Sequence, residues 1–277
     1  MNSEIVIAIS QSDRDPWKKI RQTQDKTWIN KFKNEAKIIH YFSQNPPFAI
    51  KMLDTLIEKY RFNPKLGRLI SILNQITSKF ISSKIPSYYL DIVKNELIVS
   101  SYSTYFSFGR RNLALYDWFI KETEANFLFQ TNTSSYINVK KLNQIAAKLA
   151  SSELIFAGVI NNPNLGNFKI FSGAGRLLSR ELIIEILKNR KKLKFDNLED
   201  ICISELISEI SPSIYPLERY DLNSMDKLDQ TSNEVLQRYF HFRCKSDVLP
   251  RVDDEIMSGL HKRLSDAESG IIHRNID

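Results

Sequence analysis

Glu4-Ile5-Val6-Ile7-Ala8-Ile9-Ser10 is an almost uninterrupted apolar run, rich in β-branched residues, that ends at a polar residue. Such a run is typical of a buried strand in a sheet that is covered on both faces. Residues 11–16 have the composition of a loop, and Pro16 suits the first turn of a helix over residues 17–30. A second apolar run at residues 36–42 predicts a second strand. A strand, a helix and a strand within about 40 residues form the unit from which α/β folds are built.

The same alternation continues to the end of the chain. Further strands are expected at residues 96–101, 125–130, 156–160 and 168–171, and helices at 113–122, 139–149, 179–189, 198–210 and 252–264. Residues 46–90 are rich in lysine, with apolar residues at helical spacing, and predict an inserted helical hairpin. We therefore expect a single domain over residues 1–277, with residues 211–277 as a C-terminal extension that completes the site.

Composition restricts the class of protein and of partner. The 277 residues carry 42% apolar and 26% charged side chains, which is ordinary for a globular protein. The net charge of +7 favours an anionic partner such as a nucleotide diphosphate, an anionic membrane or a nucleic acid. Two cysteines, Cys202 and Cys244, exclude a disulfide framework and a cysteine-based zinc site. Without a long apolar span or the features of a signal peptide, the sequence predicts a soluble, cytoplasmic protein.

Three segments carry a resemblance to a known family. They are Trp17-Lys18-Lys19-Ile20-Arg21-Gln22-Thr23, the block from Arg111-Asn112-Leu113 to Gln130-Thr131-Asn132-Thr133-Ser134-Ser135-Tyr136-Ile137-Asn138, and Ser172-Gly173-Ala174-Gly175-Arg176-Leu177-Leu178-Ser179-Arg180-Glu181-Leu182. They resemble, in the same order, the motifs "R-x-x-I-R-x-T-W", "R-N-L-T" with "F-x-x-K-T-D-D-D-x-F-V-N", and "S-G-A-G-Y-V-L-S-R-D-L". These motifs belong to the fringe-like, β-1,3-galactosyltransferase-like glycosyltransferase superfamily.

The resemblance implies a GT-A fold, with a mixed, mainly parallel central sheet flanked by helices. It also implies a hexosyltransferase that uses a nucleotide-sugar donor, expected to be a UDP-sugar, and inverts the anomeric centre. The acceptor would be a saccharide, a glycoconjugate or a lipid-linked sugar, as in polysaccharide biosynthesis.

The chain departs from that family where a divalent metal is normally held. The family's Asp-x-Asp aligns with Asn132-Thr133-Ser134, whose side chains are neutral. Hard divalent cations favour carboxylate oxygens, so we expect no metal site here. These residues would instead hydrogen-bond the donor, together with Ser10 at the end of the first strand.

Cationic side chains are the candidates to replace the charge of the metal. They are Arg14, Arg21, Arg243 and Lys245. On a strand, His241, Arg243 and Lys245 would point to one face and suit a phosphate group. The alternative is an edge strand with one solvated face.

Small residues mark a second part of the expected site. Ser172, Gly173, Ala174 and Gly175 would let backbone N–H groups approach the substrate closely, in a connection between a strand and a helix. The alternative is a tight turn that binds nothing.

Asp200 is the candidate catalytic residue. The resemblance implies that it is the general base, and it follows Glu199 at the expected start of a helix. The alternative is that both acids are first-turn residues favoured by the helix dipole. A second acidic cluster, residues 253–255, is a rival for the base, although it also suits the start of a helix.

Two other interpretations of the whole chain remain. Loss of the acidic pair is compatible with an inactive relative that binds glycans or proteins. Nucleic-acid binding would rest on charge alone, and no nucleic-acid partner is expected. The basic run at residues 188–194 is either a solvated helix end or a peripheral contact with an anionic membrane.

Overall fold

The computed structural model describes residues 4–12, 15–44, 84–102, 108–149, 153–162, 169–193 and 199–269. Eight of the described strands form one sheet in the order β3-β4-β2-β1-β5-β8-β7-β9. The neighbouring strands β4, β2, β1 and β5 are parallel to one another, and β7 is parallel to β9. Strand β8 is antiparallel to both of its neighbours, β5 and β7, and β3 is antiparallel to β4. The expected mixed, mainly parallel sheet is confirmed. Its strands are β1 (Ile5–Ser10), β2 (Lys37–Gln44), β3 (Tyr88–Asp91), β4 (Glu96–Tyr102), β5 (Phe127–Asn132), β7 (Ile155–Asn162), β8 (Ile170–Ser179) and β9 (Ser213–Pro216).

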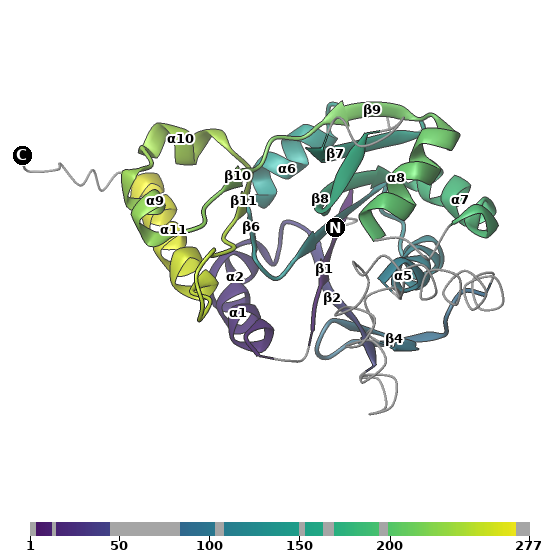
Figure 1. Ribbon diagram of the computed structural model, residues 1–277, viewed down its shortest axis with the longest axis horizontal. Helices are drawn as coiled ribbons and strands as arrows, with labels where there is room; N and C mark the ends of the chain where they lie inside the picture. The colour runs from purple at the N-terminus through teal and green to yellow at the C-terminus, as the bar shows by residue number, and fades with distance from the viewer. Residues whose placement is uncertain are drawn as a thin grey trace, which may run out of the picture.

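Helices cover both faces of this sheet (Figure 1). Alternate residues of a strand point to opposite faces, and in β1 both sets are apolar. Ile5, Ile7 and Ile9 join one buried cluster, while Val6 and Ala8 join another. The first cluster includes residues of α1 (Trp17–Gln24), α2 (Asn30–Phe32), α6 (Val139–Ala146) and α11 (Asp253–Glu268), and the second those of α5 (Phe108–Glu122), α7 (Arg180–Lys188) and α8 (Glu199–Ile210).

The expected helix over residues 17–30 is interrupted. A π-helical turn, Asp25–Ile29, lies between α1 and α2, and Thr27 within it has φ −104° and ψ −108°, outside the helical region. The hydroxyl of Thr27 donates to the carbonyl oxygen of Thr23 at 2.7 Å. Hydroxyl side chains that bond back to the preceding turn often bend helices.

The bounds of two predicted elements are clearly wrong, and other predicted bounds differ from the structure by a few residues. The predicted hairpin, residues 46–90, lies mostly outside the described residues, but its last residues form strand β3, where Pro86 and two tyrosines favour extended backbone. The strand expected to end at residue 171 continues to Ser179 as β8. It passes through Gly175, whose φ of 103° lies in a region that glycine adopts readily, and then pairs with β5.

The C-terminal residues build a second, smaller group of elements against the first buried cluster. Figure 1 shows α11 beside α1, with α9 and α10 against α11, and the group is joined to the main sheet through a small sheet of the described strands β10, β11 and β6. Among the described helices, none is both long enough and apolar enough to cross a bilayer. The bounds are β6 (Ser135–Ile137), β10 (Tyr220–Asp221), α9 (Met225–Gln230), α10 (Asn233–Arg238) and β11 (His241–Arg243), with a 3-10 turn at Arg190–Lys192.

Candidate functional site

A cleft lies at the carboxyl ends of the parallel strands, the edge of an open α/β sheet where ligands usually bind. Ser10, the last residue of β1, is the register partner of Tyr41 in β2 and of Asn132 in β5. The cavity there has a volume of about 350 Å³. Its lining residues are Ser10, Tyr41, Arg111, Asn112, Asn132, Asn161, Ser172, Gly173, Ala174, Glu199, Asp200 and Arg243.

A larger hollow of about 1030 Å³ lies near the opposite ends of β1 and β2, around residues 33–37 and 121–125. Its polar lining residues are mostly exposed lysines, glutamates and asparagines. By contrast, the cleft brings buried or half-buried polar groups together from five different strands and two helices. The cleft is therefore the candidate site, although it is the smaller hollow.

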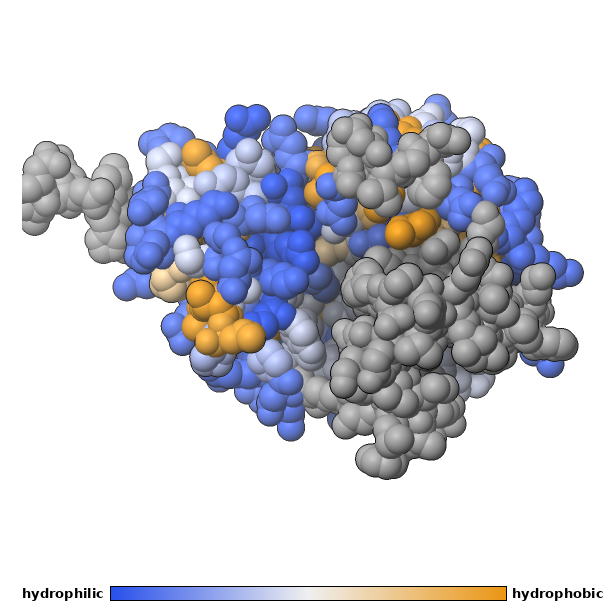
Figure 2. Space-filling view, viewed as in Figure 1, coloured by the Kyte–Doolittle hydropathy of each residue, from blue (hydrophilic) through white to orange (hydrophobic). Residues whose placement is uncertain are grey.

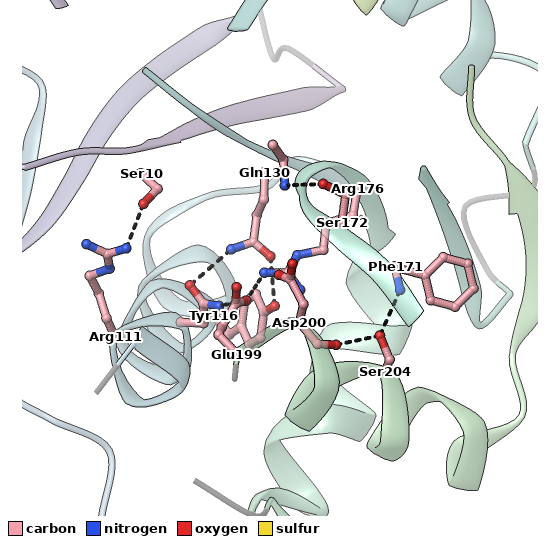
Figure 3. Close-up of polar contacts among 12 residues, drawn as sticks. Ser10, Arg111, Tyr116, Gln130, Phe171, Ser172, Arg176, Glu199, Asp200 and Ser204 are labelled. Atoms are coloured by element: carbon pink, nitrogen blue, oxygen red, sulfur yellow. Dashed lines mark hydrogen bonds and ion pairs between the residues drawn. The ribbon is translucent and has the colours of Figure 1, made fainter. Parts of the chain in front are cut away.

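One wall of the cleft is the first turn of α5. Arg111, only 2% exposed, donates from Nη2 to Ser10 Oγ at 2.6 Å and from Nη1 to the carbonyl oxygen of Gln11 at 3.3 Å. Its guanidinium lies 4.8 Å from the ring centroid of Tyr41. This arginine ties the start of α5 to the end of β1, and Figure 3 shows it beside Ser10.

Next to it, a buried polar network supports Glu199. The Glu199 carboxylate accepts hydrogen bonds from Arg176 Nη2 and Asn112 Nδ2. Behind Asn112, its Oδ1 accepts from Gln130 Nε2 at 3.3 Å, and Gln130 Oε1 accepts from the hydroxyl of Tyr116 at 2.7 Å (Figure 3). Glu199 is thus fixed by partners from β8 and α5, with the side chain of Gln130 in β5 behind them.

Asp200 lies beside Glu199 at the start of α8, against the backbone of Gly173. The N–H of Gly173 donates to its carboxylate, and a Cβ atom on Gly173 would lie 2.5 Å from Asp200 Oδ1. Burial raises the pKa of Asp200 above its ordinary value, while Arg176, the Gly173 N–H, Arg243 and Arg219 oppose that rise.

Ser204, one turn further along α8, holds this end of the helix against β8. Its hydroxyl donates to the carbonyl oxygen of Asp200 at 2.5 Å and accepts from the backbone N–H of Phe171 at 3.0 Å (Figure 3).

Arginines from the C-terminal elements form the other wall. Arg243 in β11 lines the cleft, and burial together with nearby Arg219 lowers its pKa. Arg219 donates from Nη1 to Ser172 Oγ at 3.0 Å and to the carbonyl oxygen of Ala174 at 3.1 Å, and it also pairs with Asp221. In Figure 2, hydrophilic side chains gather over the middle of the face where Figure 1 shows β10 and β11.

The segment in place of the metal-binding acids has its oxygens engaged within the protein. Asn132 Oδ1 accepts from the Ser134 N–H and from Ser135 Oγ, both at 3.1 Å. Ser134 Oγ accepts from Arg251 Nη2 at 3.0 Å. Neutral oxygens that face a guanidinium do not suit a divalent cation, so these residues do not fit a metal ion. Within the described residues, no group of three or more histidine, cysteine or acidic side chains could hold one.

Several of the predicted residues do not line the cleft. Arg21 pairs with Glu96 at 2.6 Å and with Asp25 at 3.6 Å, which directs its charge to β4 and its own helix. Arg14 lies outside the described residues. Three further predicted residues, Thr133, Ser134 and Gly175, lie next to the cleft residues in sequence but not on the cavity wall.

The predicted triad of His241, Arg243 and Lys245 is divided. His241 is fully buried, its Nε2 lies 3.1 Å from Ser135 Oγ, and burial lowers its pKa well below the ordinary range. Lys245 is exposed beyond the end of β11. Of the three, Arg243 alone lines the cavity, since Lys245 lies beyond the end of the three-residue strand and His241 is buried against Ser135.

The other two basic or acidic clusters have structural partners. In the basic run, Lys188 pairs with Glu185 and Lys192 with Glu209. In the rival acidic cluster, Asp253 pairs with Arg251, and Asp254 pairs with Lys19 at 2.8 Å. Neither cluster lines the cleft.

Comparison with known proteins gives distant structural matches. No family model and no curated protein matches the chain. A glycosyltransferase involved in the glycosylation of the major capsid of PBCV-1 is 9% identical, with a TM-score of 0.43 over 92% of this chain and 98% of that one. The galactosyltransferase LgtC, solved with donor and acceptor sugar analogues, is 8% identical, with a TM-score of 0.44 over 95% of each chain. The glycosyltransferase GlyE of Streptococcus pneumoniae TIGR4 is 9% identical, with a TM-score of 0.42 over 98% of this chain and 65% of that one. Likenesses at this level are too distant to indicate what the cleft binds.

Proposed function

We propose that the chain is a glycosyltransferase that moves a hexose from a nucleotide-sugar donor to a saccharide or glycoconjugate acceptor, with inversion and without a divalent metal. The observation that carries this proposal is the convergence of Asp200, Gly173, Asn132 and Arg243 on one cavity of about 350 Å³. Asn132 and Gly173 come from two of the three segments that carry the resemblance, Asp200 from the start of α8, and Arg243 from the C-terminal extension. A carboxylate, a glycine backbone and a cation in one cleft are the groups that sugar transfer from a diphosphate requires.

The proposed mechanism is a direct displacement. Asp200 accepts the proton of an acceptor hydroxyl as the hydroxyl oxygen forms a bond to the anomeric carbon. The bond between that carbon and the donor's phosphate oxygen breaks, and its electron pair stays on the diphosphate. A carboxylate whose pKa is raised by burial is a better base for this step than an exposed one.

The departing diphosphate needs positive charge, and we assign this role to Arg243. Its Nε is buried and has no hydrogen-bond partner among the described residues, and the Arg243 side chain lines the cavity. Arg219 and Arg251 add positive charge nearby, since both act electrostatically on Arg243. Charged hydrogen bonds to phosphate are strong, so these guanidinium groups would replace the charge of a metal ion.

The donor proposed is a UDP-sugar, and the acceptor class includes lipid-linked sugars, which a peripheral contact with an anionic membrane would suit. We also propose that residues 1–277 form one domain, because residues from the N-terminal strands and from α11 share one buried cluster.

The second candidate function is an inactive glycan-binding or protein-binding relative. The neutral Asn132-Thr133-Ser134 segment favours it, since the usual carboxylates are missing. Isothermal titration with UDP-, GDP- and CMP-sugars, each with Mn²⁺ and with EDTA, separates the candidates. Donor binding that EDTA does not weaken is the expected result. Absence of binding to every donor would contradict the enzymatic proposal, and strict dependence on Mn²⁺ would contradict its metal-independent form.

A further inference from the structure

The cleft contains two neighbouring carboxylates whose surroundings differ. Glu199 and Asp200 both approach Gly173, where a Cβ atom would lie 2.8 Å from Glu199 Oε2 and 2.5 Å from Asp200 Oδ1. Two carboxylates this close cannot both ionise freely, because like charges disfavour each other. The side chains around them therefore determine which one carries a proton.

The partners of Glu199 favour its ionised form. Its partner Arg176 is 1% exposed, and a buried guanidinium is stable only when a negative charge accompanies it. Asn112 adds a second hydrogen bond to the same oxygen, Glu199 Oε1. Protonation of Glu199 would leave Arg176 uncompensated in the protein interior.

Asp200 has no comparable partner among the described residues. It accepts the N–H of Gly173, and the cations Arg176 from β8, Arg219 after β9 and Arg243 from β11 act on it through space. Among the described residues that line the same cavity, Arg111 from α5 and Glu199 from its own helix are the other charged side chains. Burial opposes the charge of Asp200 more than these cations favour it, which agrees with its raised pKa.

We propose that Arg176 and Glu199 are positioning residues, an ion pair between a buried arginine and a half-buried glutamate that keeps Glu199 ionised and so makes Asp200 the carboxyl group that exchanges a proton in the cleft. The proposal rests on the proposed function where it names Asp200 as the base. Neither residue of the pair takes the proton itself. The sequence indicates Asp200 through the resemblance alone, with two first-turn acids as the alternative, and the buried arginine adds a physical reason for the two acids to differ.

Opposite effects of two substitutions test this arrangement. Glu199→Gln removes the adjacent negative charge and frees Arg176 to act on Asp200, so the pKa of Asp200 should fall by about one unit. Arg176→Met leaves the charge of Glu199 uncompensated, so the pKa of Asp200 should rise by about one unit. The double variant, Arg176→Met with Glu199→Gln, removes both charges and leaves no buried ion unpaired. It can therefore still be measured if Arg176→Met alone fails to fold.

The readout is a carbon-13 NMR titration of the intact chain, labelled at the aspartate carboxyl carbons. The signal of Asp200 is assigned as the one that is absent from the spectrum of the Asp200→Asn variant. Glu209→Gln is the matched control, because Glu209 lies on the exposed side of α8 and pairs with Lys192 at 3.4 Å. The control should leave the Asp200 titration unchanged, and the double variant should titrate between the two single variants.

The pH dependence of kcat/KM for sugar transfer is measured in parallel, and its acid limb should follow the titration of Asp200 in each variant. Shifts of the same sign in both single variants, or no shift in Glu199→Gln, would overturn the proposal. Expected NMR shifts in a protein that binds no donor would instead refute the proposed function and leave the role of the ion pair intact.

Discussion

Ser10 and Asn132 lie side by side as register partners at the carboxyl ends of the parallel strands β1 and β5, and both line the cleft. They are 122 positions apart in the sequence, yet the parallel pairing makes them neighbours. Arg111 from α5 binds the hydroxyl of Ser10, and the turn after Asn132 is bound by Arg251 through Ser134. The strand ends are thus connected to both walls of the site.

Replacing Asp200 with asparagine should abolish most of the transfer activity while stabilising the fold. Loss of a positioned base costs about 10² to 10⁴ in kcat. Because the pKa of Asp200 is raised above 3.8, its contribution to stability is complete below that pH and is lost as the pH rises through the raised value. Asparagine stays neutral, so the Tm of Asp200→Asn relative to the unmodified chain should increase between pH 4 and pH 8.

Thermal unfolding at the two pH values and initial rates of transfer check this prediction. Glu209→Gln is the control, with unchanged rate and Tm. A Tm difference that shrinks towards pH 8 would contradict the assignment of Asp200 as a destabilised carboxylate.

Arg243→Gln should weaken donor binding in the presence of EDTA by roughly 10- to 100-fold, the effect of losing a charged hydrogen bond of about 1.5 to 3 kcal/mol. Arg238→Gln is the control, because Arg238 is 67% exposed and pairs at 3.5 Å with Glu218 outside the cleft. Titration calorimetry with a nucleoside diphosphate measures the binding affinity of both variants. Equal losses in the two variants would indicate a general charge effect and not a phosphate contact.

Local sequence patterns predicted the parts of the fold that depend on local physics. The apolar run at Ile5–Ser10 and the capped start of α7, where Ser179 Oγ accepts from the Leu182 N–H, both lie where their residue types indicate. The course of β8 through Gly175 was missed, because small residues indicate a turn unless the partner strands are known. Pairing with β5 and β7 keeps the chain extended there.

For the site, the sequence indicated side chains at strand ends but not their long-range partners. Asn132, Gly173 and Asp200 come together because the sheet brings its strand ends to one edge. The roles of Arg111 and Arg219 depend on contacts with Ser10 and Ser172, which lie far from them in the sequence. The signal available for Arg111 was its place in the "R-N-L" segment, directly before the apolar run of the expected helix over residues 113–122.

Gly173→Ala and Gly175→Ala should have different consequences. A Cβ atom at Gly173 would lie 2.5 Å from Asp200 Oδ1, so the carboxylate must move, and a displacement of that order costs about 10²-fold in rate. At Gly175 the φ of 103° and a contact of 2.6 Å with the buried ring of His241 oppose any side chain. That strain should cost roughly 1 to 3 kcal/mol of folding free energy.

Urea denaturation and transfer rates of the two alanine variants distinguish the effects. Gly173→Ala should lose mainly activity, and Gly175→Ala mainly stability. An unaffected rate in Gly173→Ala would show that the position of Asp200 against this backbone is unimportant.

Restoring acids at both positions, Asn132→Asp with Ser134→Asp, should not create a Mn²⁺ site. The new carboxylate at position 134 would face Arg251 Nη2, which lies 3.0 Å from the present hydroxyl. Arg243 and Arg219 add positive charge nearby, which disfavours a divalent cation. Calorimetric titration with Mn²⁺ should give the same result for the double variant and the unmodified chain, and a new binding isotherm would contradict this prediction.

Ser204→Ala should destabilise the fold and lower activity together, because one hydroxyl connects α8 to β8. Its loss leaves the buried N–H of Phe171 without its acceptor at 3.0 Å, a cost of about 1 to 3 kcal/mol. The substitution also removes the hydrogen bond of 2.5 Å between the Ser204 hydroxyl and the carbonyl oxygen of Asp200, the residue proposed as the base. Ser208→Ala, an exposed position on the same helix, should stay within about 0.5 kcal/mol of the unmodified chain. Urea denaturation and transfer rates measure both variants, and a Ser204→Ala protein as stable and active as Ser208→Ala would show that the helix is anchored elsewhere.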